Sequence, residues 1–300
     1  MKRVVSVSLG SSKRDHKAET EVLGYHIKIE RRGTDGDIKR AVEMITELDG
    51  EVDAIGLGGV DLYIVAGGRR YTLADGRKMA EAAQKTPVVD GSGLKNTLER
   101  RVIENLASSG EITFKDRPVL LVSAVDRFGL AEAIDAQGAE LIIGDVMFGL
   151  GVPLPFRSLK SLDILLRVFS PVFCRLPMDM LYPTGGKQEE ITPKFRKYYD
   201  MADIIAGDLH FIRRYMPEDL QGKIIITNTV TEDNVEEFRS RGVKMLVTTT
   251  PKLQGRSFGT NVLEAVVVAA SERTSKQLTE QDYGELLEEM DIQPRIERFQ

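Results

Sequence analysis

The regular alternation of short apolar runs with helical patterns restricts the fold of this chain more than any other feature. Six strands are expected in the second part of the chain, at residues 119–125, 140–144, 171–175, 203–206, 223–227 and 244–249. Helical segments separate these strands, and continuous apolar runs such as "VLLV" suit parallel strands that are buried on both faces. The pattern predicts a doubly wound, mostly parallel, six-stranded sheet with helices on both faces.

The first part of the chain contains the same two kinds of element. Strands are expected at residues 4–9, 25–30, 53–57 and 87–89, a hairpin at 62–73, and helices at 37–48, 75–84 and 93–106. A polar, glycine-containing stretch at residues 107–117 separates this part from the second. We therefore expect an N-terminal α/β substrate domain at residues 1–110, a Rossmann-like nucleotide-binding domain at 117–275 and a helical tail at 276–300.

Composition narrows the classes of partner. The 300 residues carry a formal net charge of −5 and no basic arm, so nothing supplies the counterion release that drives nucleic-acid binding. No apolar run reaches the ~18 residues of a membrane span, and the single cysteine, Cys174, excludes an intrachain disulfide. A metal site is not expected, because the sequence has no His-Glu-x-x-His motif and no cysteine pair. We predict a cytoplasmic protein with a small-molecule substrate, and a homodimer remains open.

The turn within "VLLVSAVDRFGLAEAI" (residues 119–134) lies where a dinucleotide-binding domain holds its pyrophosphate. Only Gly129 of the Gly-x-Gly-x-x-Gly fingerprint is present, and Ser123 and Asp126 stand near the other two glycine positions. Arg127 offers a charge-assisted fork, and Asp145 follows about 20 residues after the turn, where a carboxylate binds an adenosine ribose. The turn is therefore either a site for NAD, with NADP as the alternative, or a connection without phosphate contact.

A second candidate site combines the loop at residues 11–16 with the turn at residues 90–95. The turn opens a helix, so its backbone N–H groups suit an anion, although Ser92 is also an ordinary N-cap residue. The loop carries hydroxyl, cationic and imidazole groups, which suit either a polar substrate or a solvated loop. Because both segments follow predicted strands, we expect one shared pocket for a carboxylate or phosphate. The expected substrate contacts are Ser11, Ser12, Arg14, Asp90 and Ser92.

The end of the last predicted strand is a third candidate. "LVTTTP" contains Thr248, Thr249 and Thr250, and Asn228 ends the preceding strand at the same edge of the sheet. This edge borders the ligand crevice of a doubly wound fold, so a nicotinamide is expected there. Threonine also suits strands for structural reasons alone.

The phrases "SVSLGSSKRDHK", "GLGGVDLY", "SAVDRFGLAEA" and "LVTTTP", and the order of the two domains, resemble those of shikimate and quinate dehydrogenases, including bacterial quinate 5-dehydrogenase-like proteins. The Gly-Ala-Gly-Gly turn and the Asn-Val-Thr-x-Pro-x-Lys motif of that family are absent. The resemblance implies an NAD(P)-dependent dehydrogenase of a small, polar, anionic hydroxy or keto compound. Hydride transfer needs a proton partner, for which Lys95 is the first candidate and His16 the second.

An alternative function follows from the missing glycines. Two α/β domains that face each other can hold a nucleotide-sugar or another small ligand. In that case the chain is a transferase, or a regulatory or binding protein without enzymatic activity.

Overall fold

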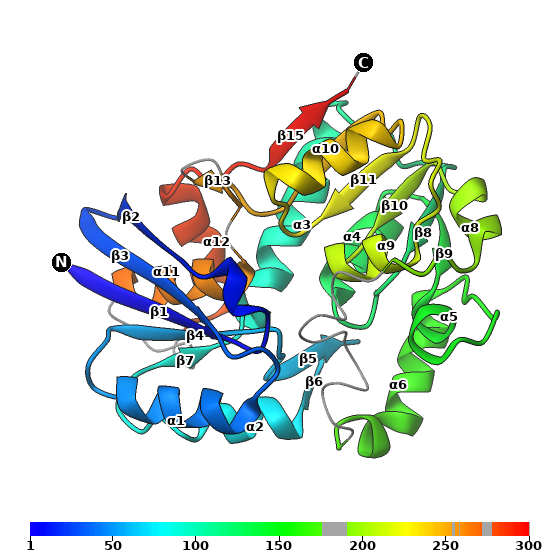
Figure 1. Cartoon of the computed structure of the whole chain (residues 1–300). Coiled ribbons are helices and arrows are strands. Elements are labelled where there is room, and N and C mark those ends of the chain that lie inside the picture. The colour runs from blue at the N-terminus through cyan, green and yellow to red at the C-terminus, as the bar shows by residue number, and fades with distance from the viewer. Residues whose placement is uncertain (176–190, 254–255, 258, 272–277, 300) are drawn as a thin grey trace.

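The computed structural model describes residues 1–175, 191–253, 256–257, 259–271 and 278–299. It has a mixed α/β fold with two mainly parallel sheets, one in each half of the molecule (Figure 1). Among the described residues no helix is both long and apolar enough to cross a membrane.

The first sheet has the strand order β2-β3-β1-β4-β7. β1 pairs in parallel with β3 and β4, whereas β2 pairs antiparallel with β3 at the edge. β2 was not predicted, because this half-exposed edge strand, "HKAETEV", has the composition of a polar loop. The strands are β1 (Lys2–Ser8), β2 (His16–Val22), β3 (Tyr25–Gly33), β4 (Ala54–Gly58) and β7 (Val88–Val89).

Helices cover both faces of the first sheet. One face packs against α1 (Ile38–Leu48) and α2 (Ala74–Ala80), and Val5 lies in this core. The other face packs against α11 (Thr260–Ser271), which in turn contacts α3 (Ser92–Ser108), and Val4 lies in that core. Successive side chains of a strand point to opposite faces, so β1 contributes to both cores. The second part of the chain thus supplies a helix, α11, to the first sheet.

The second sheet has the order β15-β12-β11-β10-β8-β9. Five strands are parallel, and β15 pairs antiparallel with β12. The parallel strands follow the flavodoxin-like doubly wound order, in which the direction of winding reverses beside β8. Ligands bind at such a reversal, beyond the carboxyl ends of the strands. The strands are β8 (Pro118–Leu121), β9 (Glu140–Ile143), β10 (Ile204–Ala206), β11 (Ile224–Thr227), β12 (Met245–Thr248) and β15 (Arg295–Arg298).

Two sequence predictions about this sheet were wrong. Residues 171–175 do not form a strand, because α6 (Leu159–Phe173) continues through most of this apolar run. The sixth strand is instead β15, from the tail that was expected to be only helical; α12 (Glu280–Glu289) is the helix of that tail. Short apolar runs do not distinguish a strand from the end of a buried helix.

The remaining elements agree closely with the predicted pattern. The hairpin consists of β5 (Tyr63–Ala66) and β6 (Arg69–Thr72), and α5 (Asp145–Leu150) follows β9. The other elements are η1 (Ser12–Arg14), α4 (Phe128–Ala136), α8 (Arg196–Met201), α9 (Leu209–Tyr215), α10 (Glu232–Ser240), β13 (Lys252–Leu253) and β14 (Arg256–Ser257).

α3 joins the two halves. It packs against α11 on the first sheet and against α4 beside the second sheet, so one apolar core runs from Val4 through Leu98 to Val119. A Cβ on Gly129 of α4 would lie 3.1 Å from the backbone oxygen of Asn96 and still closer to its side chain. Glycine at this position therefore permits the close contact of α3 with α4.

Candidate functional site

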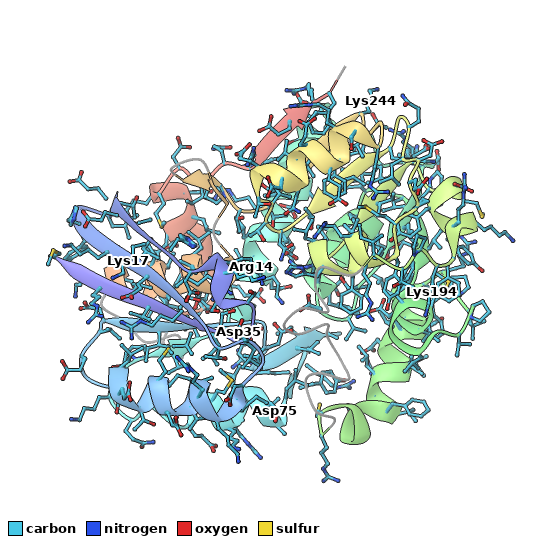
Figure 2. All side chains as sticks on the ribbon, viewed as in Figure 1. Arg14, Lys17, Asp35, Asp75, Lys194 and Lys244 are labelled. Atoms are coloured by element: carbon cyan, nitrogen blue, oxygen red, sulfur yellow. The ribbon has the colours of Figure 1, made fainter. Side chains whose placement is uncertain are left out.

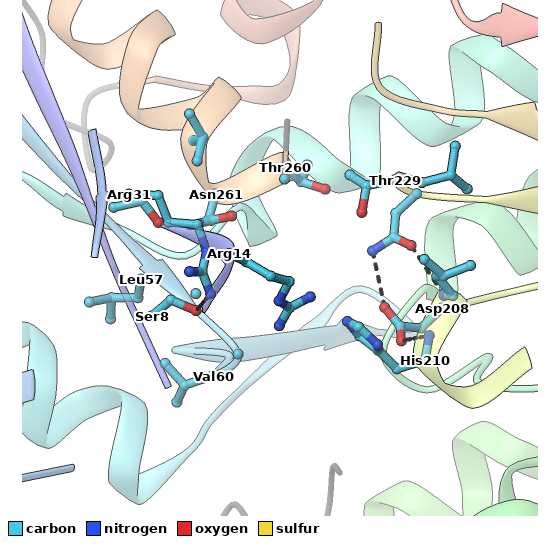
Figure 3. Close-up of a pocket in the computed structure, with 18 of the residues that line it drawn as sticks. Ser8, Arg14, Arg31, Leu57, Val60, Asp208, His210, Thr229, Thr260 and Asn261 are labelled. Carbon is cyan, nitrogen blue, oxygen red and sulfur yellow. Dashed lines mark hydrogen bonds between the residues drawn. The ribbon is translucent and has the colours of Figure 1, made fainter. Parts of the chain in front are cut away.

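A cavity of about 660 Å³ lies between the carboxyl ends of the two sheets. Ser8 and Arg31 belong to the wall formed by the first sheet, and His210 and Thr229 to the wall formed by the second (Figure 3). Asn261, at the start of α11, lies on the side of the first sheet. The arrangement follows from topology, because the loops after parallel strands gather at one edge of a sheet.

The cavity brings together residues from both predicted sites. Arg14 and Lys95 line the same cavity, as expected for a shared pocket of their two loops. Some of the residues predicted to contact a cofactor line the same cavity. The predicted residues at this cavity are Ser11, Arg14, His16, Asp90, Lys95, Asp126, Arg127 and Asn228.

The turn after β8 does not offer its backbone to a phosphate. The N–H groups of Ala124 and Val125 donate to the carboxylate of Asp145, at 3.1 and 2.7 Å. Burial raises the pKa of Asp145 to about 6, although these two hydrogen bonds act in the opposite direction. The Asp145 carboxylate therefore takes the backbone donors that a pyrophosphate would use, and its contact with a ribose stays a prediction.

The other fingerprint positions also have structural roles. Ser123 Oγ accepts a hydrogen bond of 3.0 Å from the Asp208 N–H, and Gly129 serves the contact of α3 with α4. Neither residue lines the cavity.

The guanidinium group of Arg127 is paired with buried carboxylates. It forms ion pairs with Glu99, with Asp208 at 3.3 Å and with Asp126 at 3.5 Å, and its side chain is only 5% exposed. Burial alone would lower the pKa of Arg127, but Glu99 and Asp126 outweigh burial and raise it. The predicted fork for phosphate is therefore an internal salt bridge.

The turn into α3 is likewise satisfied by carboxylates of the chain itself. The Ser92 N–H donates to Asp90 Oδ1 at 3.1 Å, and the Gly91 N–H donates to Glu264 Oε2 at 2.7 Å. Gly91 adopts φ 96°, a conformation that favours glycine. Ser92 is not the N-cap, because Gly91 holds that position and Ser92 is the first residue of α3. The Ser92 hydroxyl instead donates to the Tyr63 oxygen at 2.8 Å.

Thr248, which ends β12, and the two threonines that follow it lie in the interior. All three are buried and lie outside the cavity lining. Thr248 Oγ1 donates to the Thr250 oxygen at 2.9 Å, and Thr250 Oγ1 donates to the Asn228 oxygen at 2.8 Å. Thr249 is 1% exposed, so it offers no contact to a nicotinamide. Ser12, on the exposed loop, is bound to Asp35 through its N–H and its hydroxyl, each at 2.8 Å.

Lys95 belongs to an acidic cluster at the cavity. Its Nζ lies 2.6 Å from Asp126 Oδ1 and 3.4 Å from Asp61 Oδ1. Burial would lower the pKa of Lys95, but the two carboxylates outweigh burial and raise it. A lysine that keeps its proton is poorly suited to accept one, so these contacts favour an ion pair at Lys95, and its role as proton partner stays a prediction. His16 lines the cavity at the start of β2, and its Nδ1 lies 3.0 Å from the Arg14 oxygen.

Asp61 was not predicted as a site residue from the sequence, although its carboxyl group belongs to this cluster. Burial and the neighbouring Asp126 carboxylate raise the pKa of Asp61 to about 8. Burial would also raise the pKa of Asp126, but Lys95 and Arg127 lower it to about 2. A signal was present, since Asp61 closely follows β4 and the turn Gly58-Gly59.

Two nitrogen-bearing side chains at the cavity, a guanidinium and an imidazole, were also not predicted from the sequence. Arg31 lies within β3, and His210 lies in the first turn of α9. Arg31 donates to Asp15 Oδ1 at 2.8 Å and to Ser8 Oγ at 3.0 Å. A charged residue within an alternating strand gives no sequence signal for a site.

Among the described residues no cluster of three or more potential metal ligands occurs.

Two family models match this chain. The model for DUF8754, a domain of unknown function, matches residues 93–299. The chain belongs to the DUF8754 family. A second domain of unknown function, DUF8753, matches residues 3–90, so the two matches meet at the turn into α3. A comparison with curated proteins gives no match.

Several solved structures share a low overall similarity with this DUF8754 protein. One is a protein from Mycobacterium smegmatis in complex with β-D-fucofuranose, at 12% identity, 100% coverage of both chains and a TM-score of 0.37. A glucose-galactose binding protein from Geobacillus stearothermophilus matches at 8% identity, with 99% and 97% coverage and a TM-score of 0.39. A carbohydrate transporter solute binding protein from Agrobacterium radiobacter in complex with D-arabinose matches at 11% identity, with 91% and 90% coverage and a TM-score of 0.38.

These findings correct the resemblance to shikimate and quinate dehydrogenases. The matching families are domains of unknown function, and the three structures named above bind sugars. The expected oxidoreductase function was therefore wrong. The geometry agrees with this correction, because Asp145 accepts the backbone hydrogen bonds of the turn at which a dinucleotide was predicted.

Proposed function

We propose that this DUF8754 protein binds a small polar molecule in the cavity between its two sheets. The position of this cavity, at the carboxyl ends of both sheets, is the observation that supports the proposal most directly. Its volume of about 660 Å³ falls within the range of roughly 300–1,000 Å³ that is usual for small-molecule sites. The proposal develops the alternative function, a two-domain protein that holds a ligand between its halves.

Polar groups on the two walls are held in place by neighbouring side chains. Asn228 Nδ2 donates to Asp208 Oδ2 at 3.0 Å on one wall. Asn261 Nδ2 donates to Ser6 Oγ at 2.9 Å on the other. Groups fixed before binding lose little conformational entropy when a ligand arrives, which favours a polar ligand that contacts both walls.

In this proposal the two halves act as the domains of a ligand clamp. The first domain comprises the first sheet with α11 and α12, and the second comprises the second sheet. The finer prediction of a Rossmann-like, nucleotide-binding domain is thereby replaced by a domain that forms one wall of a ligand site.

Calorimetric titration with D-glucose, D-galactose, D-gluconate and D-glucose 6-phosphate tests the proposal. We expect saturable binding of at least one of them, and Thr229→Tyr should abolish it because the ring fills part of the cavity. Ser240→Tyr, at the exposed end of α10, is the matched control and should bind normally. Binding that survives Thr229→Tyr at full affinity, or no binding by any of the four, would count against the cavity as the site.

One observation favours a second candidate function, an enzyme that transfers a proton to or from the ligand. Asp61 lines the cavity, and burial together with Asp126 raises its pKa to about 8, so it carries a proton at pH 7. A buried carboxyl group of this kind is suited to general acid catalysis. NMR detection of deuterium exchange into a bound sugar tests this function. Asp61→Asn should abolish the exchange and retain binding; exchange that persists in the variant excludes Asp61.

A further inference from the structure

The cavity has a cationic end, which begins with two neighbouring arginines. Arg14 follows β1 and lies between the two halves (Figure 2), and Arg31 lies on β3. The Nη2 atoms of Arg14 and Arg31 lie 2.5 and 2.9 Å from the position that a Cβ on Gly10 would take. Both guanidinium groups therefore share the space beside this glycine, and both line the cavity.

Two like charges at this spacing repel each other. Burial lowers the pKa of Arg31, and the charge of Arg14 lowers it further, against the opposing effect of Asp15. Arg31 is fixed by hydrogen bonds to Asp15, Ser8 and the Ser11 oxygen, at 2.8 to 3.0 Å. A negative group placed beside the two guanidinium groups would relieve their repulsion.

The opposite wall adds the imidazole of His210 and the guanidinium of Arg213, which is paired with Glu237 at 2.6 Å. His210 points towards Arg14 across the cavity (Figure 3), and Arg213 lines the cavity one helical turn later. Burial lowers the pKa of His210, Asp208 opposes this, and Arg14 and Arg213 lower it further. Among the described residues no group forms a hydrogen bond with the buried Nδ1 of His210.

Asp208 and Asp15 at this end are engaged by other groups, and Asp233 lines the cavity as well. Asp208 accepts hydrogen bonds from the His210 N–H at 2.8 Å and from Asn228 at 3.0 Å, and it is paired with Arg127. Asp15 accepts from Arg31 and from the Gly33 N–H. These contacts distribute the negative charge over the walls, and the guanidinium groups of Arg14 and Arg31 face the same space.

We propose that the cavity selects ligands with a carboxylate or phosphate group, held by Arg14 and Arg31 on one wall and by His210 on the other. The inference rests on the proposed binding function and identifies its ligands as hydroxylated acids, such as sugar acids or sugar phosphates. Arginine forks match the geometry of both anions. From the sequence, this anion was expected at Arg14, Lys95 and the N–H groups near Ser92. In the proposal only Arg14 of these binds it, because Lys95 and the N–H groups are bound to carboxylates.

Titration of the full chain with D-glucose, D-gluconate and D-glucose 6-phosphate tests the inference, because these probes share one carbon skeleton. We expect at least one acid to bind ten-fold or more tighter than glucose, and the comparison of the two acids distinguishes carboxylate from phosphate. Arg14→Gln should weaken the binding of that acid by about 10- to 100-fold, the loss typical of a charged hydrogen bond, and weaken glucose binding far less. Arg14→Lys retains the charge without the fork and should lose less.

Arg77→Gln, on the exposed surface of α2, is the matched control and should bind every probe normally. Equal affinity for glucose and both acids would overturn the anion subsite and leave the proposed binding function intact. Arg14→Gln that weakens all three probes alike would also overturn it, since the arginine would then shape the cavity without selecting charge. Absence of binding by all three probes and by galactose counts against both proposals.

Discussion

The loop after β1 and the turn after β8 occupy equivalent places in their two sheets, yet their polar groups have different partners. In the turn after β8, backbone N–H groups bind Asp145 and Arg127 is surrounded by Glu99, Asp126 and Asp208. In the loop after β1, Arg14 lies beside Arg31 and faces the cavity. The sequence suggested phosphate binding at the turn, but the turn is satisfied internally. A strand-end turn is therefore a ligand site only when the chain leaves its polar groups facing a cavity.

The largest effect on stability is expected in the turn after β8, where Arg127 is buried. Arg127→Met should lower the free energy of unfolding by about 3–5 kcal/mol, because Glu99 and Asp208 lose the guanidinium that balances them. Urea denaturation measures the change. Arg117→Met is the control, since its pair with Asp203 is partly exposed at 36% and 44% and should contribute only about 0–1 kcal/mol. Similar losses in both variants would contradict a special role for the buried pair.

The next effect concerns the carboxylate inside the turn. Asp145→Ala leaves the N–H groups of Ala124 and Val125 without their acceptor, so unfolding should become easier by about 1–3 kcal/mol for each group that stays buried. Asp145→Asn retains one acceptor oxygen and should lose less. If Asp145→Ala unfolds at the same urea concentration as the unmodified protein, the turn does not depend on this carboxylate.

Asp61 at the cavity should make stability depend on pH. Its pKa in the folded chain, raised by burial and by Asp126, is about 8, above its ordinary value of 3.8. The folded chain therefore binds more protons than the unfolded chain between these values, so this contribution to stability is complete below pH ~4 and declines as the pH rises through 8.

Asp61→Asn removes this dependence. Relative to the unmodified protein, the variant should gain about 1–3 kcal/mol between pH 5 and 8, an estimate based on 1.4 kcal/mol per pKa unit and reduced for coupling to Asp126. Burial also raises the pKa of Asp145 to about 6 and of Glu264 to about 7, but both groups remain in the two proteins, so the difference isolates Asp61. Asp135→Asn, on the exposed side of α4, should show no such difference.

The smallest effect on stability is expected at Arg14. Arg14→Gln should change the free energy of unfolding by about 0–1 kcal/mol, the range of a partly exposed charged side chain, because Arg14 is half-buried at the cavity. Thermal unfolding without ligand measures this. A loss comparable to that of Arg127→Met would show that both loops are structural and would remove the contrast between them.

The fold was predictable where local pattern and tertiary structure agree. Apolar runs such as 119–122 become buried parallel strands, and helix starts such as Asp37 and Asp208 act as N-caps. The sequence could not reveal β15, because its "RIER" pattern becomes a strand only through pairing with β12. The interpretation of residues 171–175 failed for the opposite reason, since an apolar run also fits the end of α6.

The site was predictable in its location but only partly in its contacts. Topology correctly indicated that loops after parallel strands converge, which brought Arg14, Lys95 and Asn228 to one cavity. Which of these groups face a ligand depends on partners distant in the sequence, such as Asp126 for Lys95 and Glu264 for Gly91. Those partners are determined by packing, and a single sequence does not show them.

The position of α11 has a consequence for the order in which the protein can be made and folded. This helix covers the face of the first sheet that carries Val4 and Ala54, yet it is synthesised more than two hundred residues later. Until residue 271 has left the ribosome, the earliest strands lack one layer of their core, and exposed apolar surface of this kind promotes aggregation. A fragment that ends after residue 110 should therefore be poorly soluble, and the N-terminal half reaches its final form only after most of the chain has been translated.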